Sequence, residues 1–430
     1  MKRDPLVILL DGEVAGQLTQ STGKKLGLQY VQAWRESADA FPISLSMPLA
    51  AAGHAHAEVR SYIWGLLPEN PLVLDRWARQ FQVSPADAFA LLSHVGEDCP
   101  GAVQFVRQER VEALLAPRGQ EVDWLSSGDI AQRLRQLRVD QAAWRSASDT
   151  GQFSLAGAQP KTALLYDGRR YGVPSGRTPT THILKPPQPD LDGHAENEHL
   201  CLGLARALGL PSASSTVQHF EDEVAIVVER YDRHRAGRRW HRVHQEDMCQ
   251  ALSMSPSSKY QSEGGPSSAQ IIELLRTYSS RHHDDVRTFT SALIFNWLIA
   301  GTDAHAKNYS LLLGENGRVR LAPLYDIASA YAYPRLQHQK LKLAMKIGSK
   351  YRLHEIGRSS WQRFAKQNRI DEDELLDRAQ AMAAAIPDEY ATLRKQAARE
   401  GVKHPALERL QTTLTQQTSR CAARLTQATR

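Results

Sequence analysis

The sequence predicts an α+β fold in which a β-rich N-terminal part precedes a mixed central part and a helical C-terminal part. Three observations support this prediction: a strand pair near the N-terminus, a helix, loop and strand pair over residues 295–327, and apolar positions at helical spacing over residues 357–430. The chain has 430 residues, of which 42% are hydrophobic and 23% charged, as expected for two to three globular domains.

Composition excludes several classes of protein. No apolar run approaches the roughly 20 residues that a membrane-spanning helix needs, and Asp11 comes too early for a signal peptide. We therefore expect a cytoplasmic protein without membrane contact. The net charge of +6 permits contact with nucleic acid without indicating it. The four cysteines lie far apart and predict reduced, mostly buried thiols: Cys99, Cys201, Cys249 and Cys421.

The first hundred residues predict a compact β-rich module. Leu6–Leu10 and Val14–Leu18 flank Asp11-Gly12 as in a hairpin, and Ile43–Leu49 alternates like a half-buried strand. Two short helices follow, the second of which starts at Ser84-Pro85-Ala86-Asp87 with a capping side chain and a proline. Because this module contains no catalytic cluster, recognition, scaffolding and a purely structural role all remain open.

A polar, helical stretch from Pro117 to Ser148 predicts the boundary of the first part, and a new unit begins near Gly151. The expected domains are a β-rich domain at 1–112, a helical connector at 113–148, a lobe with a nucleotide loop and a hinge at 149–232, and a helical lobe with the catalytic loop at 233–430.

Two features of the 149–232 region are typical of nucleotide binding. Small residues at 156–158, before a strand at Thr162–Tyr166, allow backbone N–H groups to approach an anion. Lys185 closes an apolar strand, where a kinase keeps the cation that pairs with phosphates. An ordinary turn and a lysine that protects a sheet edge are the alternatives.

The next segments predict a helix and a hinge. Residues 194–208 have helical spacing and stop at Gly209. This helix offers Glu198, or alternatively Glu196, to orient the lysine. The β-branched strand Val224–Val228 then runs into 229–231, where adenine binds backbone atoms in two-lobed kinases.

The most informative stretch is 295–327. An apolar helix breaks at Gly301, and the polar loop that follows holds Asp303 and, five residues later, Asn308. Two strands, 309–313 and 318–324, then form a hairpin that returns Asp326 to the side of Asn308.

Phosphoryl transfer requires this set of groups. In a protein kinase one Asp accepts the proton of the attacking hydroxyl, an Asn five residues later holds a Mg²⁺ ion, and a later Asp holds the metal that bridges the phosphates. The neighbouring residues differ from the usual protein-kinase motifs. No HRD motif precedes the loop, and Tyr325-Asp326-Ile327 lies where a kinase has DFG. A polar loop with carboxylates that only cap turns is the alternative.

Two histidine motifs have structural interpretations. His282-His283-Asp284-Asp285, together with His305, lacks the regular spacing of zinc ligands and lies in a predicted polar linker. His244 is expected to be a helix-start residue that packs and hydrogen-bonds, and a role as a ligand or base is the alternative.

From about Gly357 onward the chain predicts a helical bundle. Two apolar faces are expected, one formed by Leu375, Leu376, Ala379, Met382 and Ala383, and the other by Leu407, Leu410, Leu414, Cys421 and Leu425.

The order of these motifs resembles the HipA family of serine/threonine-protein kinase toxins over nearly the whole chain. The motifs are SLAGAQPKTAL, ILKP, the Asn197-Glu198 helix, VVERYDR, HQEDMCQAL with KYQSEGGPS, NWLIAGTDAHAKNYSLLL and LAPLYDIASAY. The resemblance implies a two-lobed, protein-kinase-like α+β fold of the HipA type that uses ATP and Mg²⁺.

The resemblance also implies roles for individual residues. Asp303 would be the catalytic base, and Asn308 and Asp326 would hold Mg²⁺. The implied ATP-binding residues are Ala156, Gly157, Ala158, Gln159, Pro160, Lys161, Lys185, Glu229, Arg230, Tyr231, His305, Ala306, Lys307, Asn308, Tyr325 and Asp326. Pro160 departs from the family pattern, since close relatives of the best-known member have Glu there, and the proline removes a backbone donor.

Regulation and partners are implied in the same way. Autophosphorylation at Ser154 would inactivate the enzyme, since a phosphate adds about 1.5 to 2 negative charges beside a loop that holds ATP. The implied partners are a HipB-like helix-turn-helix antitoxin, operator DNA, and a protein substrate such as glutamyl-tRNA synthetase. Lys366 and Arg369 resemble DNA-contacting residues, and a solvated basic helix face is the alternative. A catalytically weak corepressor is the alternative function.

Overall fold

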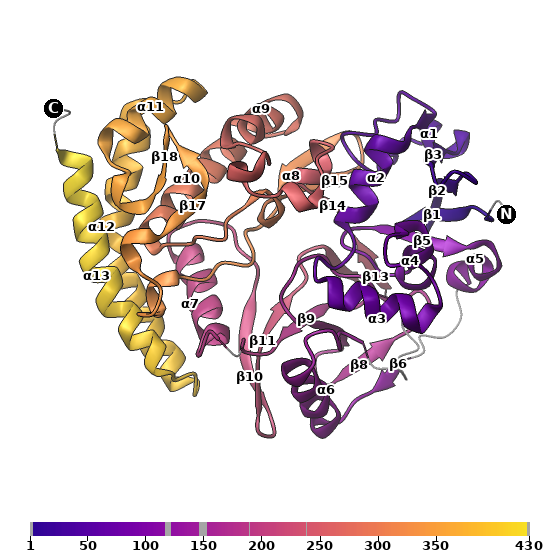
Figure 1. Cartoon of the computed structure of the whole chain (residues 1–430), viewed down its shortest axis with the longest axis horizontal. Helices are drawn as coiled ribbons and strands as arrows, with labels where there is room; N and C mark the ends of the chain where they lie inside the picture. Colours follow the sequence, from indigo (N-terminus) through magenta and orange to yellow (C-terminus); the bar gives the residue numbers. More distant parts are fainter. Residues whose placement is uncertain (1–2, 117–121, 146–152, 189, 238, 428–430) are drawn as a thin grey trace. The chain divides into compact units, whose positions relative to one another are not determined.

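The computed structural model describes residues 3–116, 122–145, 153–188, 190–237 and 239–427 (Figure 1). The chain divides into two compact units. The N-terminal unit comprises Met1–Pro186, Gln218–Ser257 and Ser310–Val319, and the C-terminal unit comprises Pro187–Val217, Ser258–Tyr309 and Arg320–Arg430. The expected domain boundary near Gly151 lies outside the described residues.

A five-stranded antiparallel sheet opens the N-terminal unit, with strand order β4-β3-β2-β1-β5. Its strands are β1 (Leu6–Leu10), β2 (Glu13–Gln20), β3 (Leu26–Tyr30), β4 (Gly53–His54) and β5 (Val103–Arg107). The helices beside it are α1 (Gln32–Glu36), α2 (His56–Gly65), α3 (Pro71–Phe81), α4 (Ala88–Val95) and α5 (Gln108–Leu115). The predicted hairpin is confirmed, because Asp11 and Gly12 turn the chain with φ of 47° and 90°.

Three predictions for this module are wrong. Ile43–Leu49 is not a strand but contains a turn closed by Met47 N–H donating to Ser44 O at 2.9 Å. The alternation misleads because Ser44 is buried and donates its hydroxyl to Glu246 at 2.5 Å. Three helices rather than two follow, and the cap of α4 is Asp87, which accepts from Ala90 N–H at 3.1 Å, rather than Ser84.

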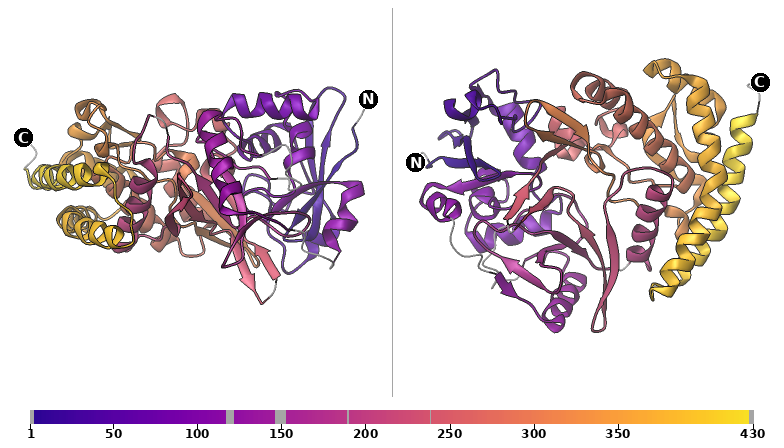
Figure 2. Two further views of the ribbon diagram at one scale, coloured as in Figure 1. Left: turned by 90° about the horizontal axis from the view of Figure 1, so that it is seen from below. Right: turned by 180° about the vertical axis from the view of Figure 1, so that it is seen from behind.

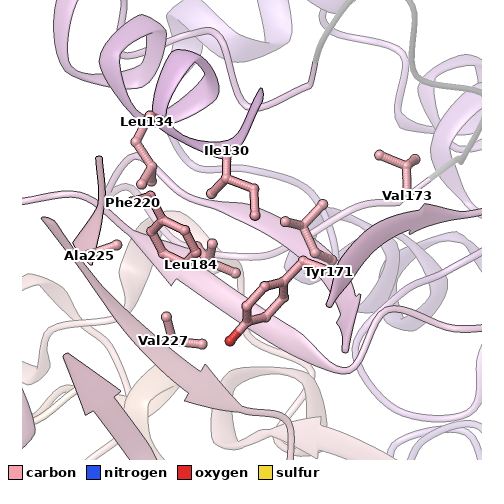
Figure 3. Packing of buried hydrophobic residues seen from close by; sticks show 10 residues of the cluster. Ile130, Leu134, Tyr171, Val173, Leu184, Phe220, Ala225 and Val227 are labelled. Carbon is pink, nitrogen blue, oxygen red and sulfur yellow. The ribbon is translucent and has the colours of Figure 1, made fainter. Parts of the chain in front are cut away.

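The second sheet has six strands in the order β10-β11-β9-β7-β8-β6. Its strands are β6 (Val122–Trp124), β7 (Thr162–Tyr166), β8 (Tyr171–Pro174), β9 (His182–Lys185), β10 (Ser215–Phe220) and β11 (Glu223–Glu229). Helix α6 (Ser127–Val139) packs Ile130 and Leu134 onto this sheet, where Leu184, Phe220 and Val227 complete the apolar cluster (Figure 3). The predicted strands at 162–166 and 224–228, and the one that Lys185 closes, are confirmed.

Shorter elements complete the N-terminal unit. They are β12 (Arg233–Ala236), β13 (Arg239–Arg242), β14 (His244–Asp247), α8 (Met248–Ala251) and β15 (Ser310–Gly314). Strand β15 pairs with β14 and with β16 (Arg318–Leu321), so the predicted hairpin after Asn308 is present with a shorter second strand.

The C-terminal unit is mainly helical. Its helices are α7 (His194–Ala207), α9 (Ser268–Tyr278), α10 (His282–Ile299), α11 (Arg358–Asn368), α12 (Glu372–Arg399) and α13 (Pro405–Thr426), with a small strand pair β17 (Lys342–Ile347) and β18 (Lys350–Arg352). Helices α12 and α13 run side by side in both views of Figure 2. Both predicted apolar faces are buried apart from half-buried Met382, which confirms the helical bundle.

Residues 282–285 correct another expectation. They form the first turn of α10 rather than a polar linker. Asp285 is buried and accepts from Ser279 Oγ at 2.6 Å and from Leu321 N–H at 2.8 Å. Its carboxylate therefore connects the start of α10 to the end of strand β16. All four cysteines are buried thiols, and within the described ranges no helix is both long and apolar enough to cross a membrane.

Candidate active site

The loop that carries Asp303 is positioned by the end of α10. The helix ends at Ile299, and Ala300 caps it in the left-handed conformation with φ of 54°. The helix therefore ends two residues before the predicted break at Gly301. A Cβ at Gly301 would lie 2.0 Å from Oδ1 of Asn296, whose amide donates to the Tyr309 hydroxyl at 3.2 Å. Glycine is required here by close approach.

We expect Gly301→Ala to destabilise the protein by about 1–3 kcal/mol, because the methyl group must displace the buried Asn296 side chain. The shift in the thermal unfolding midpoint measures this effect. Gly203→Ala is the matched control, since a Cβ there meets Leu393 at an ordinary 3.7 Å and alanine favours the helix. Equal midpoints for the two variants would contradict the steric argument.

Backbone hydrogen bonds fold the loop into a compact turn. His305 N–H donates to Asp303 O at 2.8 Å, and Asn308 N–H donates to His305 O at 2.9 Å. The Asn308 side-chain nitrogen also donates to Asp303 O at 2.7 Å. This bond directs the amide nitrogen of Asn308 into the loop. The amide oxygen, which is the atom that suits a hard cation, therefore points away from the loop backbone.

The Asp303 carboxylate lies in a mixed environment. Its side chain is 65% exposed. A general base needs such exposure because it must reach the hydroxyl of a protein substrate. The Tyr260 hydroxyl donates to Asp303 Oδ1 at 2.5 Å, and Nε2 of the buried His305 lies 3.9 Å from the same oxygen.

The segment that carries Asp326 lies against this loop. The Tyr325 hydroxyl donates to Lys307 O at 2.7 Å, which joins the residue before Asp326 to the residue before Asn308. Leu324 pairs with the 211–213 segment, since its N–H donates to Pro211 O and its carbonyl accepts from Ala213 N–H, both at 2.8 Å. Asp326 has a φ of 57°, a left-handed conformation that costs about 1–2 kcal/mol in a non-glycine residue and that is concentrated at functional sites.

Helix α7 fixes the chain just beyond Asp326. Asn197 is fully buried, accepts from Ser329 N–H at 3.1 Å and donates to Ser329 O at 2.9 Å. One amide therefore satisfies both backbone groups of Ser329. Glu196 and Glu198 on the same helix are also buried, and the choice of one of them as partner of Lys185 stays a prediction.

In the N-terminal unit the predicted nucleotide loop is held by the β-rich module. Phe153 and Gly157 form parallel bridges with Asp98 and Pro68. Ser154 is fully buried, donates its hydroxyl to Leu66 O at 2.7 Å and its N–H to Asp98 O at 3.0 Å. The module therefore holds the beginning of the loop from two sides.

The tip of the loop is tightly turned. Gly157 has a φ of 104°, and a Cβ there would lie 2.6 Å from Lys161 Nζ. Lys161 is buried and donates to Ala156 O at 2.7 Å. The small residues at 156–158 thus let the chain close on its own lysine.

The register of the sheet places the residues of the predicted hinge. Lys185 pairs with Ile226, and His182 with Glu229, so the lysine and residues 229–231 lie near opposite ends of the paired segment. Arg230 N–H donates to Thr181 O at 2.9 Å. Glu229 is exposed and Tyr231 half-buried, which suits recognition of a planar base through backbone atoms.

A buried ionic cluster joins the hinge to the β-rich module. The cluster consists of Asp98, Asp232, Arg230, Arg233 and Arg242. Arg233 lies 2.8 Å from Asp98 and 3.0 Å from Asp232. Although burial alone would raise it, the pKa of Asp98 is held well below its usual value by these arginines.

His244 has a structural role, although the expected helix start is wrong because it is the first residue of β14. Its Nδ1 accepts from Ala102 N–H at 3.2 Å, and Nε2 lies 2.8 Å from Ile43 O. Burial lowers the pKa of His244 to about 4, so the ring is neutral at pH 7.

Lys366 and Arg369 are exposed at the end of α11. Arg369 is the left-handed cap, and its carbonyl accepts from the Arg276 guanidinium at 3.1 Å. Three basic residues therefore gather at this helix end, an arrangement that suits contact with phosphate.

The predicted site residues fall into two groups. Those at 154–161, 185 and 229–231 belong to the N-terminal unit, whereas those at 303–308 and 325–326 belong to the C-terminal unit. Sequence reasoning missed three supporting residues: Asp98, Asn197 and Tyr260. Asn197 belongs to the Asn197-Glu198 helix motif and Tyr260 to the motif KYQSEGGPS. No rule of residue spacing assigned a contact to either side chain.

Comparisons with known proteins identify the family of the chain. The family of HipA-like C-terminal domains matches residues 153–390, and the HipA N-terminal domain matches residues 6–106. The chain is 40% identical to Putative kinase Y4mE of Sinorhizobium fredii, over 83% of this chain and 84% of that protein. It is 30% identical to the serine/threonine-protein kinase toxin HipA of Shewanella oneidensis, over 80% of this chain and 77% of that protein.

A solved structure shows the same fold. The Shewanella oneidensis toxin–antitoxin complex of HipA, HipB and operator DNA matches with a TM-score of 0.83 and 25% identity, over 97% of both chains. The fold is therefore α+β and kinase-like, with the β-rich N-terminal region and helical C-terminal end that were predicted. Since the C-terminal family alone matches more than half of the sequence, the chain belongs to the HipA family of serine/threonine kinase toxins.

Proposed function

We propose that this protein is an ATP- and Mg²⁺-dependent serine/threonine-protein kinase that acts as the toxin of a HipA/HipB-type pair. The observation that carries the proposal is the catalytic loop itself. Asn308 is tied to Asp303 by a 2.7 Å hydrogen bond, and Tyr325 brings the segment of Asp326 to Lys307 at 2.7 Å. One base and two oxygen ligands thus come from adjacent segments, as phosphoryl transfer requires.

Each side chain has a distinct role in the proposed reaction. Asp303 accepts the proton of the attacking serine or threonine hydroxyl. The Asn308 amide oxygen and the Asp326 carboxylate are hard ligands of the kind that Mg²⁺ prefers, so the donor set fits that ion. When bound, Mg²⁺ neutralises charge on the phosphates.

Roles in nucleotide binding are proposed for each group of predicted residues separately. The loop 156–161 provides small residues and backbone donors, Lys185 pairs with phosphates, and residues 229–231 bind adenine through backbone atoms. Residues 305–308 and Tyr325 with Asp326 contribute the remaining contacts. The family relationship and the buried lysines Lys161 and Lys185 support this assignment.

Autophosphorylation of Ser154 would be self-limiting. Because the Ser154 hydroxyl is fully buried against Leu66 O, it must leave this position before it can accept phosphate. A phosphate with about 1.5 to 2 negative charges could not return to that buried place beside a carbonyl oxygen. The modified loop would then stay displaced, and nucleotide binding would be lost.

Partners are proposed from the relatives. The Shewanella oneidensis structure contains HipA, HipB and operator DNA, and we propose a HipB-like antitoxin and operator DNA for this chain, with Lys366 and Arg369 as candidate phosphate contacts. The protein substrate is proposed to be a translation factor such as glutamyl-tRNA synthetase. The proposed location is the cytoplasm.

Incubation of the purified protein with labelled ATP and Mg²⁺ tests the proposal. We expect label on Ser154, identified by mass spectrometry, and its loss in Ser154→Ala, with transfer to other protein acceptors retained. Absence of label from the wild-type protein together with capture of an antitoxin from the native cell would instead indicate a corepressor. Transfer only to small molecules would indicate a different kinase class.

A further inference from the structure

We propose that Tyr260 is a positioning residue that holds the Asp303 carboxylate in its reactive orientation. The inference rests on the proposed function and adds a residue to the same site. Its geometric basis is the 2.5 Å hydrogen bond from the Tyr260 hydroxyl to Asp303 Oδ1.

The segment that presents Tyr260 is anchored on both sides. Before it, Lys259 O accepts from Ala306 N–H in the catalytic loop at 3.3 Å. After it, Gln261 Oε1 accepts from Lys346 N–H in β17 at 2.8 Å. Tyr260 O itself accepts from Glu263 N–H and Gly265 N–H, both at 2.9 Å, which closes a tight turn. The phenol is therefore presented by a fixed backbone.

The ring of Tyr260 is fixed as well. It packs edge-on against the buried His305 ring, with centroids 5.0 Å apart and planes at 88°. Because His305 belongs to the catalytic loop, the phenol packs directly on the loop that carries the base. His305 Nε2 lies 3.9 Å from the oxygen that Tyr260 contacts, so both groups face Asp303 Oδ1.

This contact has a function that packing alone does not explain. The bond from the Tyr260 hydroxyl favours one rotamer of an aspartate whose side chain is 65% exposed. A general base must keep its oxygen within hydrogen-bond reach of the attacking hydroxyl, and small misplacement lowers the rate strongly. A carboxylate accepts about four hydrogen bonds, so the Tyr260 bond is compatible with one from the acceptor hydroxyl. Tyr260 therefore orients the base without competing for it.

The test is the transfer rate of Tyr260→Phe, which removes the hydroxyl and keeps the ring on His305. We expect kcat for a protein acceptor to fall about tenfold, with the KM for ATP and the thermal midpoint unchanged. Tyr278→Phe, which removes a hydroxyl from the partly exposed end of α9 in the same unit, is the control and should match the wild type.

Tyr260→Ala separates the hydroxyl from the ring. If the hydroxyl is what matters, the phenylalanine variant restores stability but not kcat relative to the alanine variant. A kcat of Tyr260→Phe within twofold of the wild type overturns the positioning role while leaving the kinase assignment intact. A fall in kcat accompanied by a lower thermal midpoint also overturns it, since the role would then be structural. Failure of the wild type to transfer phosphate overturns both proposals.

Discussion

Asp303→Asn is expected to lower phosphate transfer by about 100- to 10,000-fold, the range for loss of a general base. The amide is nearly isosteric but cannot accept the proton of the attacking hydroxyl. Because the Asp303 side chain is 65% exposed, the substitution should leave the thermal midpoint nearly unchanged. The rate of label transfer from ATP to a protein acceptor under single-turnover conditions measures the effect directly.

The matched control for this substitution is Asp284→Asn. Asp284 is also exposed, at 53%, and lies in the first turn of α10 in an ion pair with Arg281. We expect its rate to stay within twofold of the wild type. If Asp303→Asn kept a tenth or more of the wild-type rate, the base would be a different group, and the assignment of the catalytic loop would fail.

Local sequence rules predicted the secondary structure around the site because its signals are local. The Asp11-Gly12 turn, the β-branched run at 224–228 and the spacing from Asp303 to Asn308 are each readable within a few residues. The structure places a hairpin, strand β11 and a compact loop at those positions. The strand prediction for Ile43–Leu49 was wrong because the structure there depends on a distant contact. Ser44 is buried against Glu246, which lies 202 positions away.

The supporting residues of the site could not be predicted in this way. Tyr260 meets Asp303 across 43 positions, and Asn197 meets Ser329 across 132. No periodicity links such pairs, so their contacts come only from the tertiary fold. The family resemblance supplied the residue roles, but it assigned no contact to either residue.

Asp98→Asn is expected to have the largest effect on stability, about 3–5 kcal/mol of lost unfolding free energy, because it leaves buried arginines without one of their two carboxylates. Asp98 accepts from Arg233 at 2.8 Å and from the Thr180 hydroxyl at 2.6 Å, and lies 3.6 Å from Arg230. Urea unfolding at pH 7 measures the change. Asp222→Asn is the control, since its carboxylate is 68% exposed beside Arg135 and should contribute at most about 1 kcal/mol.

The pH dependence of this difference tests the electrostatic cause. The arginines lower the pKa of Asp98 in the folded protein, whereas the unfolded chain titrates near the ordinary value of about 3.9. A depressed folded-state pKa stabilises the protein above the unfolded value, and the contribution is lost as pH falls toward the folded value. The wild type and Asp98→Asn should therefore differ fully above about pH 5 and converge as pH drops below about 4. A difference that stayed constant over this range, or one below about 1 kcal/mol at pH 7, would mean that packing rather than charge joins the β-rich module to the hinge.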